Sequence, residues 1–199
     1  MKTRVITIGR QFGSGGREIG LRLAEALSVE FYDKQLVTLA AERSGVIPEV
    51  FENVDEKAAS PWLYAAVDVN GITTYIPTSS NDRLFELQSN LIKEVAAKGD
   101  CVIVGRCADY ILRNEDIELY NLFVCAPMEI RIARKQAQEK LDENSTKALI
   151  KKTDKDRRAY YNYYTNKEWN SPESYDITVN SSRLGITETA ILLSKIFAK

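Results

Sequence analysis

The stretch VITIGRQFGSGGRE, residues 5–18, decides the fold. Its first four residues are apolar or β-branched and stop at Gly9, which predicts a buried strand. Three more glycines follow within seven residues, and the apolar side chains after them recur at helical spacing as far as Leu27. A strand, a glycine-rich loop and a helix in this order indicate the first unit of an α/β protein.

The rest of the chain continues this alternation. Residues 84–97 have helical periodicity, and short apolar runs predict further strands at 30–32, 101–104, 119–125 and 177–180. Continuous apolar strands separated by helices are typical of a parallel sheet covered by helices on both faces. A length of 199 residues suits one such domain. We therefore expect a single three-layer α/β domain over residues 1–199.

One segment interrupts the pattern between the second predicted strand and the helix near residue 84. It carries prolines, serine-rich patches and the dipeptide Asn70-Gly71 between β-forming residues, which predicts a hairpin. A segment this short rarely builds a core of its own. We therefore expect an insertion at the edge of the sheet and not a second domain.

Charge is distributed unevenly. Lys and Arg number 27 against 28 Asp and Glu, so no overall field favours nucleic acid or an anionic membrane. Residues 131–158 nevertheless hold ten basic and five acidic side chains, a local net charge of +5. A site for an anion must therefore be local, and the expected partners are small molecules.

Composition excludes several kinds of chemistry. The chain has no histidine, which removes Ser-His-Asp triads, Cys-His pairs and histidine metal sites. Its three cysteines have no C-x-x-C spacing, which argues against a disulfide framework and a thiolate metal site. No apolar run of about 18 residues or signal-peptide pattern occurs, so a cytoplasmic location is expected.

The glycine-rich loop is the first candidate site. Glycines let backbone N–H groups turn inward, and a helix N-terminus favours an anion, so the junction suits phosphate. The alternative is a tight turn without a ligand. A dinucleotide fingerprint fits only in part, because Glu18 stands where its third glycine belongs. The phosphate loop pattern G-x-x-x-x-G-K-[ST] fits the context better, but its lysine and hydroxyl residue are absent.

Several separated motifs resemble the cytidylate kinase-like family, a divergent group of P-loop nucleoside-monophosphate kinases. They are GSGGREI, FYD, CVIVGRCADYIL, RRAYYNYY and YDITVNSS, beginning at residues 13, 31, 101, 157 and 175. The resemblance implies a P-loop NTPase fold with a five-stranded parallel sheet in the order 2-3-1-4-5. It also implies an acceptor-binding insertion at 34–83 and a helical lid at 140–165.

The resemblance assigns site residues position by position. A gapless alignment of the loop places Gly16 where the family has its lysine, whereas a shift by one residue places Arg17 there and Glu18 at the hydroxyl position. Donor phosphates would lie on Gly13, Ser14, Gly15, Gly16, Arg17 and Glu18. The acceptor would be bound by Asp33, Arg106, Arg131 and Asp154. Charge in the transition state would be neutralised by Arg17, Arg134 and Arg157, and Glu18 is the candidate metal ligand.

Phosphoryl transfer agrees with this set, because it mainly requires phosphates to be positioned and their charge neutralised. Arginine suits that work because its planar fork binds phosphate oxygens in pairs and stays charged. We therefore expect a kinase that uses ATP and Mg²⁺ and phosphorylates a nucleoside monophosphate, with CMP or dCMP first. The alternative functions are a nucleotide-binding regulatory protein that has lost transfer and, more remotely, a Rossmann oxidoreductase. For Arg106 itself, the alternative to phosphate binding is a structural ion pair.

Overall fold

A five-stranded parallel sheet forms the centre of the protein. The computed structural model describes residues 2–33, 36, 65–69, 72–76 and 79–198. The strands lie in the order β2 (Glu30–Tyr32), β5 (Cys101–Val104), β1 (Arg4–Arg10), β6 (Glu118–Cys125) and β7 (Ile177–Asn180). Counted along the chain without the hairpin of the insertion, this is the predicted order 2-3-1-4-5, which is confirmed.

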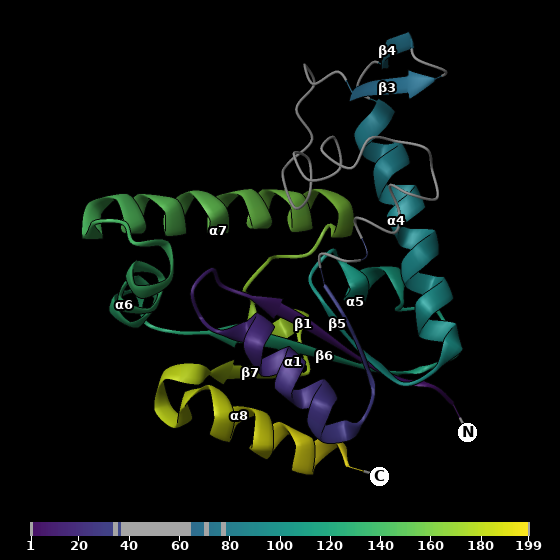
Figure 1. The fold of residues 1–199 in the computed structure, drawn as a ribbon. Helices are drawn as coiled ribbons and strands as arrows, with labels where there is room; N and C mark the ends of the chain where they lie inside the picture. The colour runs from purple at the N-terminus through teal and green to yellow at the C-terminus, as the bar shows by residue number, and fades with distance from the viewer. Residues whose placement is uncertain (1, 34–35, 37–64, 70–71, 77–78, 199) are drawn as a thin grey trace.

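The middle strand is buried on both faces because its apolar side chains alternate between them. Val5 packs with β5 and with α4 (Ser79–Lys98) and α5 (Ala108–Ile111). Ile6 and Ile8 pack on the other face, against α1 (Gly16–Leu27) and α8 (Ser181–Phe197). Helices therefore cover both faces of the sheet, as the continuous apolar strands predict (Figure 1).

Parallel pairing brings the ends of neighbouring strands to one edge. Ile8 of β1 is in register with Val104 of β5 and Leu122 of β6, so the segments that follow these strands leave the sheet side by side. Ligands of open α/β sheets bind at this carboxyl edge. The glycine-rich loop after β1 and Arg106 after β5 both lie there.

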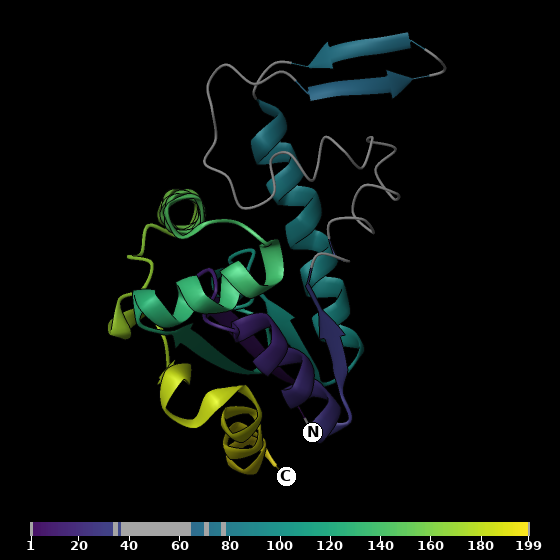
Figure 2. The ribbon, with the colours of Figure 1, turned by 60° about the vertical axis from the view of Figure 1, so that its left-hand side comes forward.

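Two helices extend beyond this edge. They are α6 (Met128–Glu139) and the long α7 (Glu143–Thr165), whose N-terminus is capped by the Asp142 side chain at 3.0 Å from the Ser145 amide. Figure 1 shows α7 lying across the carboxyl edge, and Figure 2 shows it end-on. The predicted lid segment 140–165 corresponds to this helix.

The last turns of α7 join an aromatic cluster. Tyr160 and Tyr161 are buried with Phe123 of β6 and with Trp169, which lies before the short 3₁₀ helix η1 (Pro172–Ser174). Phe123 and Trp169 meet edge to face with their ring centroids 5.3 Å apart. These rings therefore anchor α7 to the sheet, the packing role that aromatic pairs commonly have in cores.

Part of the insertion is visible as a hairpin. Strands β3 (Ala65–Val69) and β4 (Ile72–Ile76) pair antiparallel, as the sequence around Asn70-Gly71 predicts, while those two residues lie outside the described ones. Residues 34–35 and 37–64 of the predicted acceptor-binding segment also lie outside them. Among the described residues, no helix is long and apolar enough to cross a membrane.

Candidate functional site

The glycine-rich loop connects β1 to α1 through two left-handed backbone positions. Gly13 has φ +84° and Gly15 has φ +83°, values that side chains rarely allow. Gly15 is the N-cap of α1 and supplies no side chain to the free N–H groups of the first turn. These N–H groups and the helix dipole make this end of α1 suited to an anion.

The space beside both glycines is also tight. A Cβ on Gly13 would lie 3.0 Å from the Arg131 backbone oxygen, and one on Gly15 would lie 2.8 Å from Ile186 Cδ1. A substitution at either position therefore distorts the loop itself, whether or not a ligand is bound. A variant such as Gly15→Val would therefore disturb the loop as well as phosphate binding and could not separate the two.

A largely buried ion pair holds the loop from the side of α6 and α7. The Asp154 carboxylate accepts a bond from the Phe12 amide at 2.7 Å and from Arg131 Nη1 at 2.5 Å. Arg131 Nη1 also donates to the Phe12 carbonyl at 3.3 Å. From the other side, the Ser181 hydroxyl donates to the Ser14 carbonyl at 2.6 Å. Three separate segments thus fix the loop, and we call Arg131 and Asp154 the loop clamp.

A cavity of about 970 Å³ opens beside the loop at the carboxyl edge of the sheet. Six basic and three acidic side chains line it, whereas the whole chain has a net charge of −1. The basic ones come from five segments and are Arg10, Arg17, Arg106, Arg134, Lys135 and Arg157. The local positive site that the charge distribution predicts is therefore present and is large enough for a small ligand.

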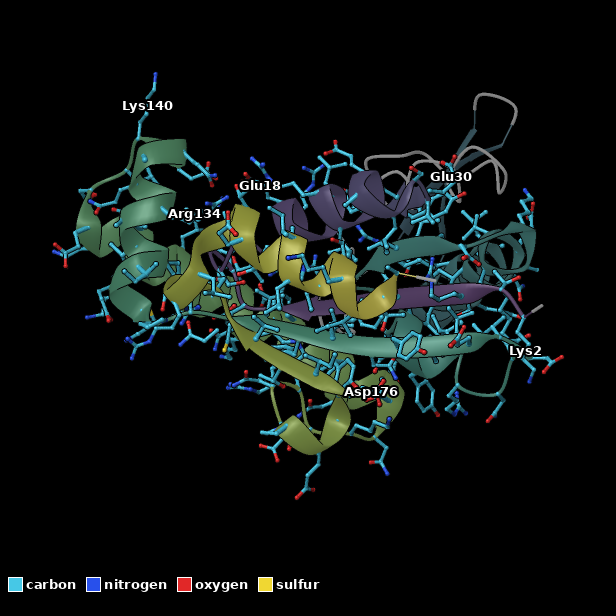
Figure 3. The ribbon with its side chains drawn as sticks, turned by 90° about the horizontal axis from the view of Figure 1, so that it is seen from below. Lys2, Glu18, Glu30, Arg134, Lys140 and Asp176 are labelled. Atoms are coloured by element: carbon cyan, nitrogen blue, oxygen red, sulfur yellow. The ribbon has the colours of Figure 1, made fainter. Side chains whose placement is uncertain are left out.

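The acidic residues on the loop side each meet an arginine. Glu18 accepts bonds from Arg134 at 2.5 Å and from Arg22 at 3.1 Å, and Figure 3 shows Glu18 beside Arg134. The bond from Arg134 lowers the pKa of the Glu18 carboxyl, although partial burial opposes this. Arg17 donates to Asp33, whose side chain is nearly buried. The carboxylates therefore hold two cations at the mouth of the cavity.

Arg106 occupies an unusual backbone turn. Gly105, Arg106 and Cys107 have φ values of +80°, +58° and +54° in succession. Left-handed geometry at a residue with a side chain costs about 1 kcal/mol or more, and such strain gathers at functional sites. The turn places the Arg106 side chain, which is 2% exposed, at the base of the cavity, where Nη1 donates to the Val104 carbonyl at 2.9 Å.

A smaller cavity of about 30 Å³ lies deeper, between Arg106 and the aromatic cluster. Asp109 lines it and accepts a bond from the Tyr161 hydroxyl at 2.6 Å. Burial raises the pKa of Asp109, and the bond from Tyr161 opposes this only in part. Burial likewise raises the pKa of Tyr161. This inner space is therefore lined mainly by buried side chains, several of them polar.

The structure divides the predicted site residues into two groups. Those on the cavity wall are Gly13, Gly15, Gly16, Arg17, Glu18, Asp33, Arg106, Arg134 and Arg157. Of the described residues, Ser14, Arg131 and Asp154 do not line it: Ser14 is buried, with its hydroxyl on the Gln11 carbonyl at 2.8 Å, and the other two form the loop clamp.

Sequence reasoning missed two basic residues of the wall. Lys135 lies beside the predicted Arg134, and its ammonium group is 4.3 Å from the centre of the Phe12 ring. Arg10 lies inside the quoted loop sequence itself. The position of a positive charge so close to the glycines could have marked Arg10 as a phosphate-binding candidate. Among the described residues, no group of three or more acidic, cysteine or histidine side chains is arranged to hold a metal ion.

Comparisons with solved structures find the same fold in other proteins. A solved structure of an uncharacterized protein from Eubacterium ventriosum matches with a TM-score of 0.71 and 25% identity, over 98% of this chain and 99% of that one. Shikimate kinase from Bacteroides thetaiotaomicron shares the fold, with a TM-score of 0.57 and 16% identity over the full length of both chains.

A curated relative is the cytidylate kinase of Methanopyrus kandleri, 24% identical over 197 residues, which cover 95% of this chain and 90% of that protein. The sequence model of the cytidylate kinase-like family matches residues 5–183. With its core-strand order 2-3-1-4-5 and a glycine-rich loop at the carboxyl edge of the sheet, this chain belongs to the cytidylate kinase-like family.

Proposed function

We propose that this protein transfers the γ-phosphate of ATP to a nucleoside monophosphate. The observation that carries the proposal is the positive cavity, in which a glycine-rich helix N-terminus meets arginines from separate segments. Kinases need this arrangement because phosphoryl transfer depends on positioning phosphates and neutralising their charge. The relation to cytidylate kinases supports CMP or dCMP as the first acceptors to test.

The donor phosphates would lie against the loop between Gly13 and Glu18. There the first N–H groups of α1 supply hydrogen-bond donors that need no side chain. Bound Mg²⁺ would supply positive charge against the donor phosphates. Glu18 fits as its protein ligand because it lies on the cavity wall and its lowered pKa keeps it ionised.

The acceptor would bind on the side of β2 and β5. Arg106, at the end of β5, would bind the acceptor phosphate, and Asp33, which accepts a bond from Arg17, would border the acceptor at the end of β2. Within the single domain, segment 34–83 is the acceptor-binding insertion of this proposal. Segment 140–165 acts as the lid, carrying Arg157 on α7 toward the transferred group.

The transfer step forms one P–O bond and breaks another. An oxygen of the acceptor phosphate attacks the γ-phosphorus of ATP and forms the new P–O bond. The bond from that phosphorus to the β–γ bridging oxygen breaks, and ADP leaves with the electron pair. Arg134 and Arg157 line the cavity and neutralise charge on the transferred group. A cytoplasmic location and small-molecule nucleotides as partners, without nucleic acid or membrane, belong to the same proposal.

The test is a panel of ligands followed by an activity assay. ATP and CMP should each raise the melting temperature, whereas NAD should not, and ATP with an acceptor should give Mg²⁺-dependent ADP release. Stabilisation by ATP without ADP release for any common nucleoside or deoxynucleoside monophosphate would favour a nucleotide-binding regulatory protein. Stabilisation by NAD alone would contradict the kinase proposal.

A further inference from the structure

The loop lacks the lysine of the phosphate loop pattern, but a basic residue, Arg10, occupies another position of that pattern. In G-x-x-x-x-G-K the first glycine precedes the second by five residues. With Gly15 as the second glycine, the lysine position is Gly16 and the first glycine position is Arg10. Glycine and cation have therefore exchanged places in this chain.

The structure supplies the physical reason for the exchange. A Cβ built on Gly16 would lie 2.6 Å from the Cβ and 3.3 Å from the Cγ of Arg10, and 3.1 Å from the Cβ of Val124. Contacts of 2.6 Å between such atoms are sterically excluded. A lysine side chain therefore does not fit at residue 16, because the Cβ and Cγ atoms of Arg10 occupy the space where the lysine Cβ would lie.

The position of Arg10 is fixed by the sheet and by the lid helix. Its backbone pairs with Val124 at the end of β1, and its carbonyl accepts a bond from Arg157 Nη1 at 3.2 Å. Its side chain lines both the large cavity and the inner one. The stem thus crosses Gly16, the first residue of α1, and leads into the space where the donor phosphates would lie.

Two other cations at the loop lie elsewhere. Arg17 follows Gly16 in sequence but is directed to Asp33 at the end of β2, and its side chain is 63% exposed. Arg134 reaches the loop from α6 and is held by Glu18. Among the three nearest atoms to a Cβ built on Gly16, none belongs to Arg17 or Arg134, whereas two belong to Arg10.

We propose that Arg10 is the donor-phosphate cation of this protein and replaces the P-loop lysine. This inference rests on the proposed function, since it assumes that a nucleoside triphosphate binds at the loop. The Arg10 guanidinium would bind β- and γ-phosphate oxygens in pairs and would stay bound to them during transfer. The charge then comes from the end of the strand and not from the helix.

Binding measurements test the proposal without requiring turnover. Arg10→Met keeps an unbranched stem over Gly16 and removes the charge. It should weaken ATP binding at least about tenfold and leave AMP binding, which involves no β- or γ-phosphate, within about twofold. If an acceptor is found, kcat should fall by a factor of about 10² to 10³, and Arg10→Lys should restore most of it.

The exchange itself can be reversed. Gly16→Lys alone should fold poorly because of the clash with the Arg10 stem. The double variant Arg10→Gly with Gly16→Lys removes that stem and should bind ATP more tightly than Arg10→Gly alone. Arg113→Met is the matched control, since Arg113 is exposed and lines neither cavity.

The outcomes separate this inference from the proposed function. Equal losses for ATP and AMP in Arg10→Met, at unchanged melting temperature, would show that Arg10 does not act on the β- and γ-phosphates in particular and would overturn the inference. Unchanged ATP binding in Arg10→Met would overturn it as well. A wild-type protein that binds ATP through Arg10 but releases no ADP would contradict only the proposed kinase activity.

Discussion

Replacing Asp154 with Asn tests whether the loop clamp is structural or part of the acceptor site. Asn keeps the shape of the side chain but offers one acceptor oxygen in place of two. The Phe12 amide and Arg131 Nη1 each use one oxygen now, so one of them would face the Asn amide group. The Asp154 side chain is 15% exposed and that of Arg131 is 7% exposed, so water cannot fully replace the lost bond.

The expected cost follows from these contacts. Loss of one charge-assisted hydrogen bond at this depth should lower the free energy of unfolding by about 1.5 to 3 kcal/mol. Asp154→Ala leaves the Arg131 charge without its carboxylate and should cost about 3 to 5 kcal/mol. For a chain of this size, each 1 kcal/mol corresponds to about 2 to 4 °C. We therefore expect Asp154→Asn to melt about 3 to 12 °C below the wild type.

The assay is thermal unfolding by circular dichroism, followed by ATP and CMP titration at a temperature where every variant is folded. Asp156→Asn, on the same helix, is the matched control and should melt close to the wild type. Since the clamp holds the loop, the Asn variant should also bind ATP more weakly. A variant that melts within about 1 °C of the wild type yet loses only CMP binding would refute the clamp and make Asp154 an acceptor ligand.

Three further variants test the cavities. Arg106→Ala should weaken acceptor binding about 30-fold per folded molecule, as measured by calorimetry, because it removes a charge-assisted contact; unchanged affinity would make Arg106 purely structural. Arg157→Ala should lower kcat more than it raises KM, because a lid residue acts on the transferred group after closure, and a change confined to KM would contradict this. Burial raises the pKa of Asp109, so its stabilising contribution is complete at low pH and is lost as the pH rises through that pKa. Asp109→Asn cannot ionise and should therefore gain stability over the wild type as the pH rises above about 4, the ordinary pKa of an aspartate; a difference in melting temperature that does not vary with pH would count against this account.

Much of the fold follows from local sequence patterns. The run Cys101–Val104 is apolar at every position, so it predicts a strand buried on both faces, and it lies beside β1 in the sheet. Asn70-Gly71 predicts a hairpin because few other dipeptides fit so tight a turn, and its flanking strands pair. Both features depend only on residues close together in the sequence, so a single sequence is enough to predict them.

The partners of the charges could not be predicted in the same way. Residues 131–158 form one basic run in the sequence, yet Arg131 turns to the loop clamp while Arg134, one turn of α6 later, meets Glu18. The crossing of α6 and α7 over the loop decides these contacts. The close approach of Arg10 to Gly16 is likewise a tertiary packing fact, although both residues stand inside the stretch that predicts the fold.

The central claim is that this site transfers a phosphoryl group, and labelled ATP tests it most directly. The protein would be incubated with Mg²⁺, ATP labelled in the γ-phosphate and each common nucleoside and deoxynucleoside monophosphate in turn. Separated products should carry the label in a nucleoside diphosphate, with CMP or dCMP the best acceptor, and the signal should fall in Arg157→Ala. Label that stays in ATP with every acceptor, although ATP is bound, would contradict the claim.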